Sequence, residues 1–395
     1  MTDHDMTDHT TDRVRSRRRL LLPAAVLALT SGLAATPSAA QAETATQAAP
    51  ASDAVQKSLD ALVRADGFPA ALASVRGRDG RVRDYTAGVA DLRTGAKVPV
   101  DGYVRIGSNT KTFTAVVVLQ LAGEGKVRLD EPIETYLPAL VRGRGGDGRR
   151  ITVRQLLQHT TGLPDYTAFL AQGALRYRHT YLQPRELLDM ALKEKSHFSP
   201  GTKWEYSNTN YLVAGLLIEK VTRRPLIEEI TDRVVRRIGL RHTYFPNVGD
   251  QGVRAPHPKG YHRDDPGTPL TDVTEWDPSQ AWSAGAMIST PSDLNRFFTA
   301  LLGGELLEPE QLAQMRTTVK ADGLGKGARY GLGLVSTPLS CGGLAWGHGG
   351  DIFGYHTGNA VAEDGRAAAV AVTRLPESLE TLGRVEKVVD TALCS

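Results

Sequence analysis

Matching strand–turn–strand patterns at the two ends of the chain constrain its fold more than any other feature of the sequence. Toward the N-terminus, residues 70–75 and 82–87 are strand-like runs separated by a short turn that contains Asp-Gly. Toward the C-terminus, residues 354–361 and 367–372 repeat this pattern, again with Asp-Gly in the turn. Asp-Gly between apolar runs favours a β-hairpin, so each end is predicted to supply one antiparallel pair.

Helical periodicity accompanies both hairpins. Residues 54–66 and 379–393 place apolar side chains on one helical face,. We therefore predict an α/β (α+β) fold in which both chain ends build one antiparallel sheet flanked by helices. Residues 125–270 are helix-rich, with glycine and proline breaks, and are predicted to form an inserted all-α domain. The sheet domain is then predicted to consist of residues 54–124 and 271–395.

The first 42 residues have the three parts of a signal peptide. Five arginines between Arg13 and Arg19 precede a short apolar run, residues 20–29, and Ala40-Gln41-Ala42 is an A-x-A cleavage site,. We predict that residues 1–42 are removed, that residues 43–53 form an Ala/Thr/Pro linker, and that the product is secreted. An uncleaved N-terminal anchor is the alternative, although the apolar run falls short of the ~20 residues of a spanning helix. The general and the twin-arginine export routes both stay open.

Charge and cysteine content bear on the functions that the chain can have. It has 47 Lys and Arg against 44 Asp and Glu, a net charge of +3, so it lacks the basic surplus of a dedicated nucleic-acid binder. Its two cysteines, Cys341 and Cys394, are too few for an all-cysteine zinc site,. In an exported protein they are predicted to form a disulfide. No other apolar stretch predicts a membrane span after signal cleavage.

Ser108-Asn109-Thr110-Lys111 is an S-x-x-K sequence ahead of an apolar helical stretch. Residues three apart share a helix face, so Lys111 can act as a base for Ser108 if burial lowers the pKa of its amine. A helix N-terminus also supplies positive potential for an oxyanion. Taken alone, the pattern is better explained by an N-cap serine followed by a surface lysine.

Two further short sequences carry candidate site residues. Tyr206-Ser207-Asn208 offers a phenol that can shuttle protons and an amide that can donate to a substrate carbonyl,. His348-Gly349-Gly350 precedes an apolar strand, and its glycines would let a substrate backbone lie along the strand edge,. A charged His348 could orient the tyrosine or a substrate anion. By itself, the first sequence is more simply explained as a core tyrosine with a turn asparagine. The second is more simply explained as a loop histidine between glycines.

Together, the three sequences resemble the S-x-x-K, Y-x-N and H/K-x-G motifs of the serine β-lactamase and D-alanyl-D-alanine carboxypeptidase family. Residues 151–163, 283–294 and 330–334 are similar to further stretches of its class C β-lactamase-like branch, and the resemblance covers about residues 54 to 395. The chain most resembles the soluble D-alanyl-D-alanine carboxypeptidases of actinobacteria. This resemblance implies a β-lactamase/transpeptidase-like fold.

The resemblance also implies acyl transfer through an acyl-serine. Ser108 would be the nucleophile, and Lys111 and Tyr206 would share the proton transfers, with either of them as the base for acylation. Asn208 and His348 would hold this network in place.

The oxyanion hole of such a site would use the backbone N–H groups of Ser108 and Asp351. Gly349 and Gly350 would then lie at substrate-binding positions. No metal ion or cofactor is implied. His159, within a Thr-Thr-Gly-Leu setting, is predicted to be a packed turn residue.

Three positions depart from the carboxypeptidase pattern. Gly349 replaces a threonine, Val335 stands where similar carboxypeptidases have an arginine, and Asp351 puts a negative charge where an anionic substrate would end. These changes should weaken a site for a substrate carboxylate.

From the resemblance we expect a secreted, monomeric serine hydrolase similar to D-Ala-D-Ala carboxypeptidases. It would act on peptidoglycan stem peptides or small molecules and could be acylated by β-lactams. An esterase or a β-lactamase that uses the same site is the alternative, and the departures at Val335 and Gly349 favour an esterase. A non-catalytic penicillin-binding protein of the cell wall is a third candidate, but it would not need all four of Ser108, Lys111, Tyr206 and Asn208.

Overall fold

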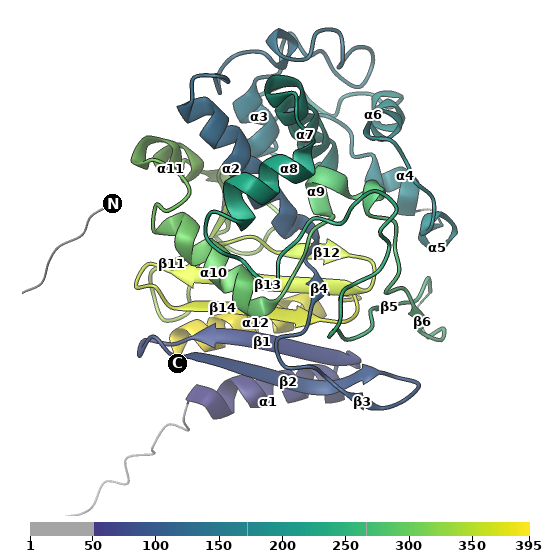
Figure 1. Ribbon diagram of the computed structural model, residues 1–395, viewed down its shortest axis with the longest axis vertical. Coiled ribbons are helices and arrows are strands. Elements are labelled where there is room, and N and C mark those ends of the chain that lie inside the picture. Colours follow the sequence, from purple (N-terminus) through teal and green to yellow (C-terminus); the bar gives the residue numbers. More distant parts are fainter. Residues whose placement is uncertain (1–50, 172, 266) are drawn as a thin grey trace, which may run out of the picture. The chain divides into compact units, whose positions relative to one another are not determined.

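The computed structural model describes residues 51–395 with the exception of residues 172 and 266 (Figure 1). The predicted signal peptide, residues 1–42, lies outside the described residues, as does most of the predicted linker. Its last three residues, 51–53, belong to the first helix.

The helices are α1 (Ala51–Arg64), α2 (Thr110–Gly123), α3 (Val153–Gln158), α4 (Thr167–Ala171), α5 (Ala174–Tyr177), α6 (Pro184–Leu192), α7 (Asn208–Thr222), α8 (Leu226–Ile230), α9 (Trp282–Gly285), α10 (Pro291–Leu302), α11 (Pro309–Met315) and α12 (Leu379–Cys394). The strands are β1 (Ala70–Arg76), β2 (Val82–Asp91), β3 (Ala96–Lys97), β4 (Val104–Arg105), β5 (Tyr261–His262), β6 (Thr271–Asp272), β7 (Ile288–Ser289), β8 (Val319–Lys320), β9 (Arg329–Tyr330), β10 (Val335–Pro338), β11 (Leu344–Gly347), β12 (Gly350–Ile352), β13 (Tyr355–Ala362) and β14 (Ala367–Val372).

The main sheet joins the two ends of the chain, as the sequence predicts. Its strand order is β3-β2-β1-β14-β13-β11-β10-β9-β8, with β12 paired to β13, and all of its pairs are antiparallel. The two predicted hairpins meet at its centre, where Ala71 of β1 lies opposite Val372 of β14. The predicted fold class is therefore confirmed. The sequence did not indicate β8 to β11, which extend the sheet beyond the C-terminal hairpin.

Helices cover both faces of the sheet because its central strands are apolar on both sides. In β14, Ala367, Ala369 and Ala371 join one core cluster, and the alternate residues Ala368 and Val370 join the other. The second cluster also holds the apolar faces of α1 and α12, whereas α10 packs into the first (Figure 1). Strands buried on both faces read as continuous apolar runs, which is what these segments show.

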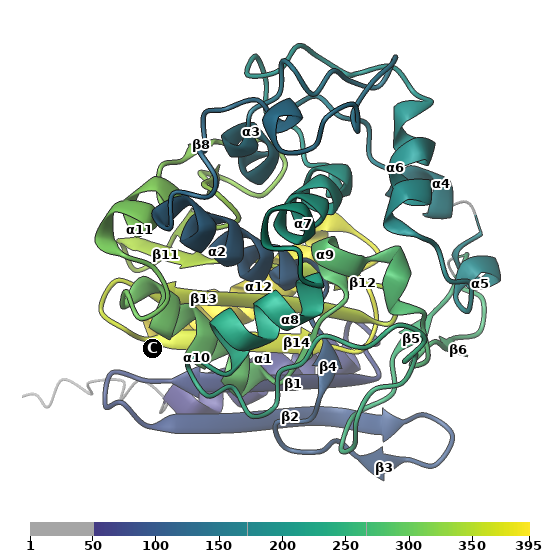
Figure 2. The same cartoon turned by 45° about the horizontal axis from the view of Figure 1, so that its top comes forward.

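Helix α2 crosses the first of these faces and is buried over most of its length. Eleven of its residues are buried, including Lys111 in its first turn. Figure 2 shows α2 beside α7 and α9, above the sheet. A short 3₁₀ turn, Gly107–Asn109, leads directly into α2. The fold therefore places Ser108 at the start of a buried helix.

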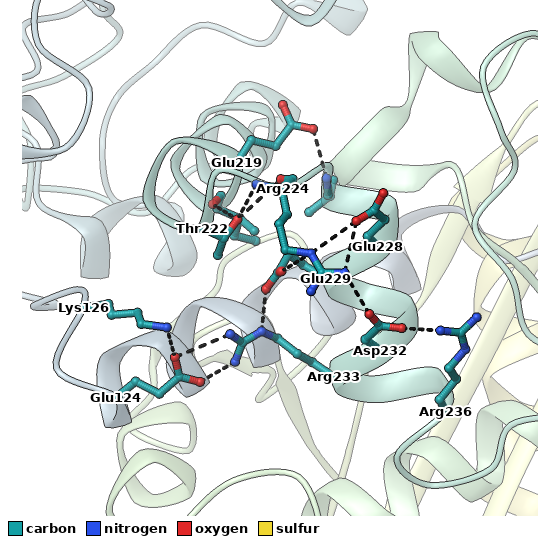
Figure 3. A network of polar contacts seen from close by, with 12 residues as sticks. Glu124, Lys126, Glu219, Thr222, Arg224, Glu228, Glu229, Asp232, Arg233 and Arg236 are labelled. Atoms are coloured by element: carbon teal, nitrogen blue, oxygen red, sulfur yellow. Dashed lines mark hydrogen bonds and ion pairs between the residues drawn. The ribbon is translucent and has the colours of Figure 1, made fainter.

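Residues 125–270 contain α3 to α8 but also the short strand β5, so the segment is mainly helical and not all-α. The proposed domain boundaries at residues 125 and 270 stay a prediction. An ion-pair network ties this segment to the end of α2 (Figure 3). Arg233 binds Glu229 at 2.5 Å and also Glu124, which follows α2. Glu229 in turn contacts Arg224 at 3.5 Å.

The predicted disulfide is present. Cys341, in the turn between β10 and β11, is bonded to Cys394 in the last turn of α12, with their Cα atoms 5.6 Å apart. It closes a sequence separation of 53 residues and fastens the end of the chain to the sheet. Among the described helices, none is both long and apolar enough to cross a membrane.

Candidate active site

Ser108 and Lys111 lie side by side, as the S-x-x-K spacing predicts. Lys111 Nζ is 2.9 Å from Ser108 Oγ. The same nitrogen is 2.7 Å from Asn208 Oδ1 and 2.8 Å from the carbonyl oxygen of Ala284. The lysine therefore has three polar partners, of which only the serine hydroxyl can donate a hydrogen bond.

The environment of Lys111 favours the neutral amine. The side chain is fully buried, and this burial lowers its pKa to about 7, although the negative charges of Asp165 and Asp351 oppose the fall. A neutral amine has two N–H donors and one lone pair. The donors match the two carbonyl-type acceptors, and the lone pair is left for the Ser108 hydroxyl.

Asn208 connects this pair to an acidic residue that the sequence did not indicate. Its amide nitrogen donates to Asp165 Oδ2 at 2.9 Å and to Thr167 Oγ1 at 3.4 Å, so its oxygen faces Lys111. The predicted donation from Asn208 to a substrate would compete with these bonds. Asp165 lies 43 residues before Asn208 in the chain, and only the folded structure brings the two together.

Tyr206 lies against the same lysine. Lys111 Nζ is 4.9 Å from the centre of the tyrosine ring. The hydroxyl of Tyr206 is buried, and no described residue lies in position to form a hydrogen bond with it. Burial raises the pKa of Tyr206 well above its ordinary value, Tyr330 adds to the rise, and the nearby Ser108 hydroxyl opposes it. This phenol is therefore protonated at neutral pH.

The imidazole ring of His159 packs against the ring of Tyr206. The two rings stack with their centres 4.3 Å apart and their planes at 29°. Nδ1 of His159 is 3.2 Å from the backbone nitrogen of Ser207 and 3.0 Å from the amide nitrogen of Asn210. The residue caps α3 in a left-handed turn, as its predicted packed-turn role requires. Burial lowers its pKa well below the ordinary value, with the charge of Lys111 contributing, so the ring is neutral.

His348 is also neutral, in contrast to the charged histidine considered from the sequence. Burial lowers its pKa to about 3, and the Lys111 charge adds to this effect. Its Nδ1 lies 2.6 Å from the carbonyl oxygen of Gly349, and its Nε2 lies 2.9 Å from the hydroxyl of Tyr330. We assign the ring proton to Nδ1, because only a donor can bond a carbonyl oxygen. Tyr330 then donates to Nε2.

Two glycines allow β12 to approach the nucleophile closely. Gly107 has a φ of +48°, and a Cβ on it would lie 2.7 Å from the carbonyl oxygen of Asp351. A Cβ on Gly350 would lie 2.0 Å from the carbonyl oxygen of Ile106. The backbone of Asp351 consequently packs beside that of Gly107 and Ser108, where the two predicted oxyanion-hole N–H groups can converge.

These residues open onto one cleft with a volume of about 1530 Å³. Its wall near the site includes Trp276, whose ring stacks on Phe353 at 4.6 Å. Lys111 is buried behind Ser108 and does not reach the surface of the cleft. The remaining sequence-predicted site residues all line it, as does Val335: Ser108, Tyr206, Asn208, His348, Gly349, Gly350 and Asp351.

Comparison with known proteins places this arrangement in a wider context. The family profile described as "Beta-lactamase" matches residues 55–390. A D-stereospecific amidohydrolase from a Streptomyces species is similar in structure, with a TM-score of 0.78, 40% sequence identity, and coverage of 84% of this chain and 98% of that one. The D-amino acid amidase from Ochrobactrum anthropi SV3 has a TM-score of 0.76 at 27% identity, covering 86% and 98% of the two chains.

Another relative is Protein flp from Staphylococcus aureus strain MW2, which is 27% identical over 213 residues. The match covers 53% of this chain but only 41% of that protein. The chain thus spans less than half the length of this relative.

Proposed function

The chain belongs to the beta-lactamase family of serine hydrolases, and from this premise we propose that it hydrolyses amide bonds of D-amino-acid derivatives through an acyl-Ser108 intermediate. The contacts of Lys111 carry the proposal. A buried lysine with two fixed acceptors and a serine hydroxyl at 2.9 Å is arranged to take a proton from that hydroxyl,.

The proton transfers follow from the charge states of the site. The Ser108 hydroxyl gives its proton to the Lys111 lone pair as its oxygen attacks the substrate carbonyl carbon. Tyr206 is a protonated phenol, which cannot accept this proton, so Lys111 is the base for acylation,. The backbone N–H groups of Ser108 and Asp351 would stabilise the oxyanion.

The leaving amine must receive a proton when the amide bond breaks. The Tyr206 hydroxyl can supply it and be reprotonated from the Lys111 ammonium, because no other described residue holds this hydroxyl in a hydrogen bond,. A water molecule then attacks the carbonyl carbon of the acyl-serine and gives a proton to the neutral Lys111. The Lys111 ammonium returns this proton to the Ser108 oxygen as the acyl bond breaks, and the product acid departs.

Two observations support D-amino-acid amides as the substrates. Similarity to the D-stereospecific amidohydrolase extends over nearly all of that chain at 40% identity. The cleft also offers no cation where the resemblance to carboxypeptidases would place one, because Val335 and Gly349 line it and His348 is neutral. A substrate that ends in an amide rather than in a carboxylate fits this lining better.

The carboxypeptidase activity suggested by the sequence stays a prediction, as do esterase and β-lactamase activities. One experiment separates the proposed amidase activity from the carboxypeptidase activity. The purified protein is incubated with D-phenylalanine amide, L-phenylalanine amide and a D-Ala-D-Ala peptide, and the released acids are measured. We expect hydrolysis of the D-amide, with far slower hydrolysis of the others and none by Ser108→Ala. Preference for the D-Ala-D-Ala peptide would contradict the proposal.

We also propose that the protein is exported. The predicted leader supports this, and a disulfide between Cys341 and Cys394 is stable in an oxidising compartment,. N-terminal sequencing of protein recovered from the culture medium should begin near Glu43. Recovery of only the uncleaved chain in the cytoplasm would contradict export.

A further inference from the structure

His159 has a backbone conformation that side chains other than glycine rarely adopt. It ends α3 with a φ of 59° and a ψ of 39°, in the left-handed region. Glycine is the usual residue at such a helix end, because it lacks a Cβ and adopts this conformation without strain. Strained residues of this kind are concentrated at functional sites, where their surroundings compensate for the strain.

The imidazole of His159 is buried at a further energetic cost. The residue is fully buried, and its Nδ1 lies 3.2 Å from the backbone nitrogen of Ser207. Because a backbone N–H can only donate, we assign Nδ1 as the acceptor. The neutral ring then carries its proton on Nε2, which has no hydrogen-bond partner among the described residues. An unpaired buried donor is unfavourable, so a glycine at this position would avoid both costs.

In return, His159 holds the chain on both sides of Tyr206. Its backbone carbonyl oxygen accepts a hydrogen bond from the backbone nitrogen of Glu205 at 3.0 Å. Its Nδ1 accepts the bond from Ser207 at 3.2 Å. Its ring also stacks on the ring of Tyr206, with the centres 4.3 Å apart. A single residue therefore contacts the tyrosine ring and the residues before and after it.

Other groups hold the Tyr206 ring less closely. Its hydroxyl has no hydrogen-bond partner in the described part of the chain. The ring centres of Tyr330 and His348 are both 6.3 Å from that of Tyr206, and Lys111 Nζ is 4.9 Å from it. The position of the phenol oxygen consequently depends on the backbone and the ring face that His159 contacts.

His159 is itself fixed between α3 and α7, which pack together (Figure 2). Its backbone nitrogen donates to the carbonyl oxygen of Leu156 at 3.3 Å. Its Nδ1 is also 3.0 Å from the amide nitrogen of Asn210, in the first turn of α7. The hydroxyl of Thr161 donates to Oδ1 of Asn210 at 2.6 Å and so orients that amide. The imidazole is thus a rigid support for Tyr206.

We propose that His159 is a positioning residue, which keeps the Tyr206 hydroxyl within reach of the leaving nitrogen. This inference rests on the proposed function and deepens it, because it assigns one more residue to a defined step. In that step, the Tyr206 hydroxyl gives its proton to the leaving nitrogen as the carbon–nitrogen bond breaks, and the Lys111 ammonium reprotonates the phenolate. His159 does not line the cleft and exchanges no proton, so it acts only through Tyr206.

Two substrates whose leaving groups differ in their need for a proton test this role. D-phenylalanine amide and the p-nitrophenyl ester of D-phenylalanine have the same acyl part. The amide nitrogen cannot leave without a proton, whereas p-nitrophenolate is a stable anion that leaves without one. The ratio of the two kcat/KM values, amide to ester, therefore measures how well Tyr206 protonates the leaving group.

His159→Asn removes the ring but keeps a side-chain oxygen that can accept from Ser207, in a residue that tolerates the left-handed turn. We expect kcat/KM for the amide to fall about 10- to 100-fold, and that for the ester by no more than about twofold. If this variant does not fold, His159→Gly, which also suits the turn, should show the same fall in the ratio.

Phe297→Leu is the matched control. Phe297 stacks on Phe113 with the ring centres 3.7 Å apart, so this variant loses a buried ring contact that does not involve Tyr206. It should keep the ratio of amide to ester even if it is less stable.

A double-mutant cycle shows whether His159 acts through Tyr206. In the Tyr206→Phe background, His159→Asn should not change the ratio further, since the hydroxyl that it positions is absent. A ratio that His159→Asn leaves unchanged in the otherwise wild-type protein, or that falls further in the Tyr206→Phe background, would overturn the proposal.

A third substrate separates this proposal from the proposed function. The methyl ester of D-phenylalanine also needs a proton on its leaving group, because methoxide is a poor leaving group. Hydrolysis of both esters but not of the amide would refute the proposed function, and the ratio of methyl to p-nitrophenyl ester would then report the role of His159 in the same way. An active D-amidase whose ratio is unaffected by His159→Asn would refute the positioning role and leave the proposed function standing.

Discussion

Replacement of Asp165 by asparagine tests whether Lys111 is the base for acylation. One oxygen of Asp165 accepts a hydrogen bond from Asn208, and the other accepts one from the backbone N–H of Thr167. An asparagine oxygen can keep the bond to Asn208, at the loss of the bond to Thr167, while one negative charge is removed. The Asp165 charge opposes the fall in the pKa of Lys111. Its loss should therefore lower that pKa further.

The magnitude follows from the hydrogen-bond chain. Bonds of 2.7 and 2.9 Å, with the Asn208 amide between them, put the two charges roughly 6–7 Å apart,. At an effective dielectric constant of about 20–40, Coulomb's law gives about 1–2.5 kcal/mol, or about one to two pKa units. Taking the lower value, the pKa of Lys111 should fall from about 7 to roughly 6,.

The assay is the pH dependence of kcat/KM for a D-amino-acid amide. Activity should rise with pH as Lys111 loses its proton, so the acid limb should move down by about one pH unit in Asp165→Asn. Near pH 6, the neutral fraction would rise about fivefold, and activity relative to the plateau would rise with it. Asp189→Asn, at an exposed ion pair on α6, is the control and should not shift the limb. An unchanged limb, or one moved to higher pH, would refute Lys111 as the base.

Other substitutions test separate parts of the site and fold. Tyr206→Phe should lower kcat by about 10²- to 10⁴-fold without lowering the melting temperature, because the lost hydroxyl has no hydrogen-bond partner in the described part of the chain. An equal loss of stability and activity would point to a structural role. Gly349→Thr combined with Val335→Arg should raise kcat/KM for peptides that end in a carboxylate by about tenfold, because the pair adds a hydroxyl donor and a cation. The threonine can be accommodated, since a Cβ at Gly349 lies 3.5 Å from its nearest neighbour. No gain would show that these positions do not select the substrate terminus. Arg233→Met should lower the free energy of unfolding, measured with urea, by about 1–3 kcal/mol. The reason is that the Glu229 side chain is 5% exposed and loses its nearest partner. Unchanged stability would show that the ion-pair network of Figure 3 contributes little to folding.

Short-range patterns in the sequence predicted the secondary structure at the two chain ends and three residues of the site. The two Asp-Gly hairpins and the terminal helices identified β1, β2, β13, β14, α1 and α12. The motifs identified Ser108, Lys111 and Tyr206, which the fold brings together. Strands β8 to β11 were missed because all four are only two to four residues long, too short for a clear alternation.

The charge states and the second layer of the site depend on tertiary structure. Burial of Lys111 and His348, which sets their pKa values, arises from α2, α7 and the sheet packing around them. Asp165 carries no motif, and its bond to Asn208 exists only because the loop before α4 lies beside the start of α7. Tyr330 lay in a stretch that resembles the family, but its bond to His348 was visible only in the structure.

Trapping the acyl-enzyme tests the central claim most directly. The protein is mixed with the p-nitrophenyl ester of a D-amino acid, quenched rapidly, digested and analysed by mass spectrometry. We predict a mass increase equal to the acyl group on the peptide that contains Ser108, and neither adduct nor turnover in Ser108→Ala. Turnover by Ser108→Ala, or an adduct on another residue, would contradict the account.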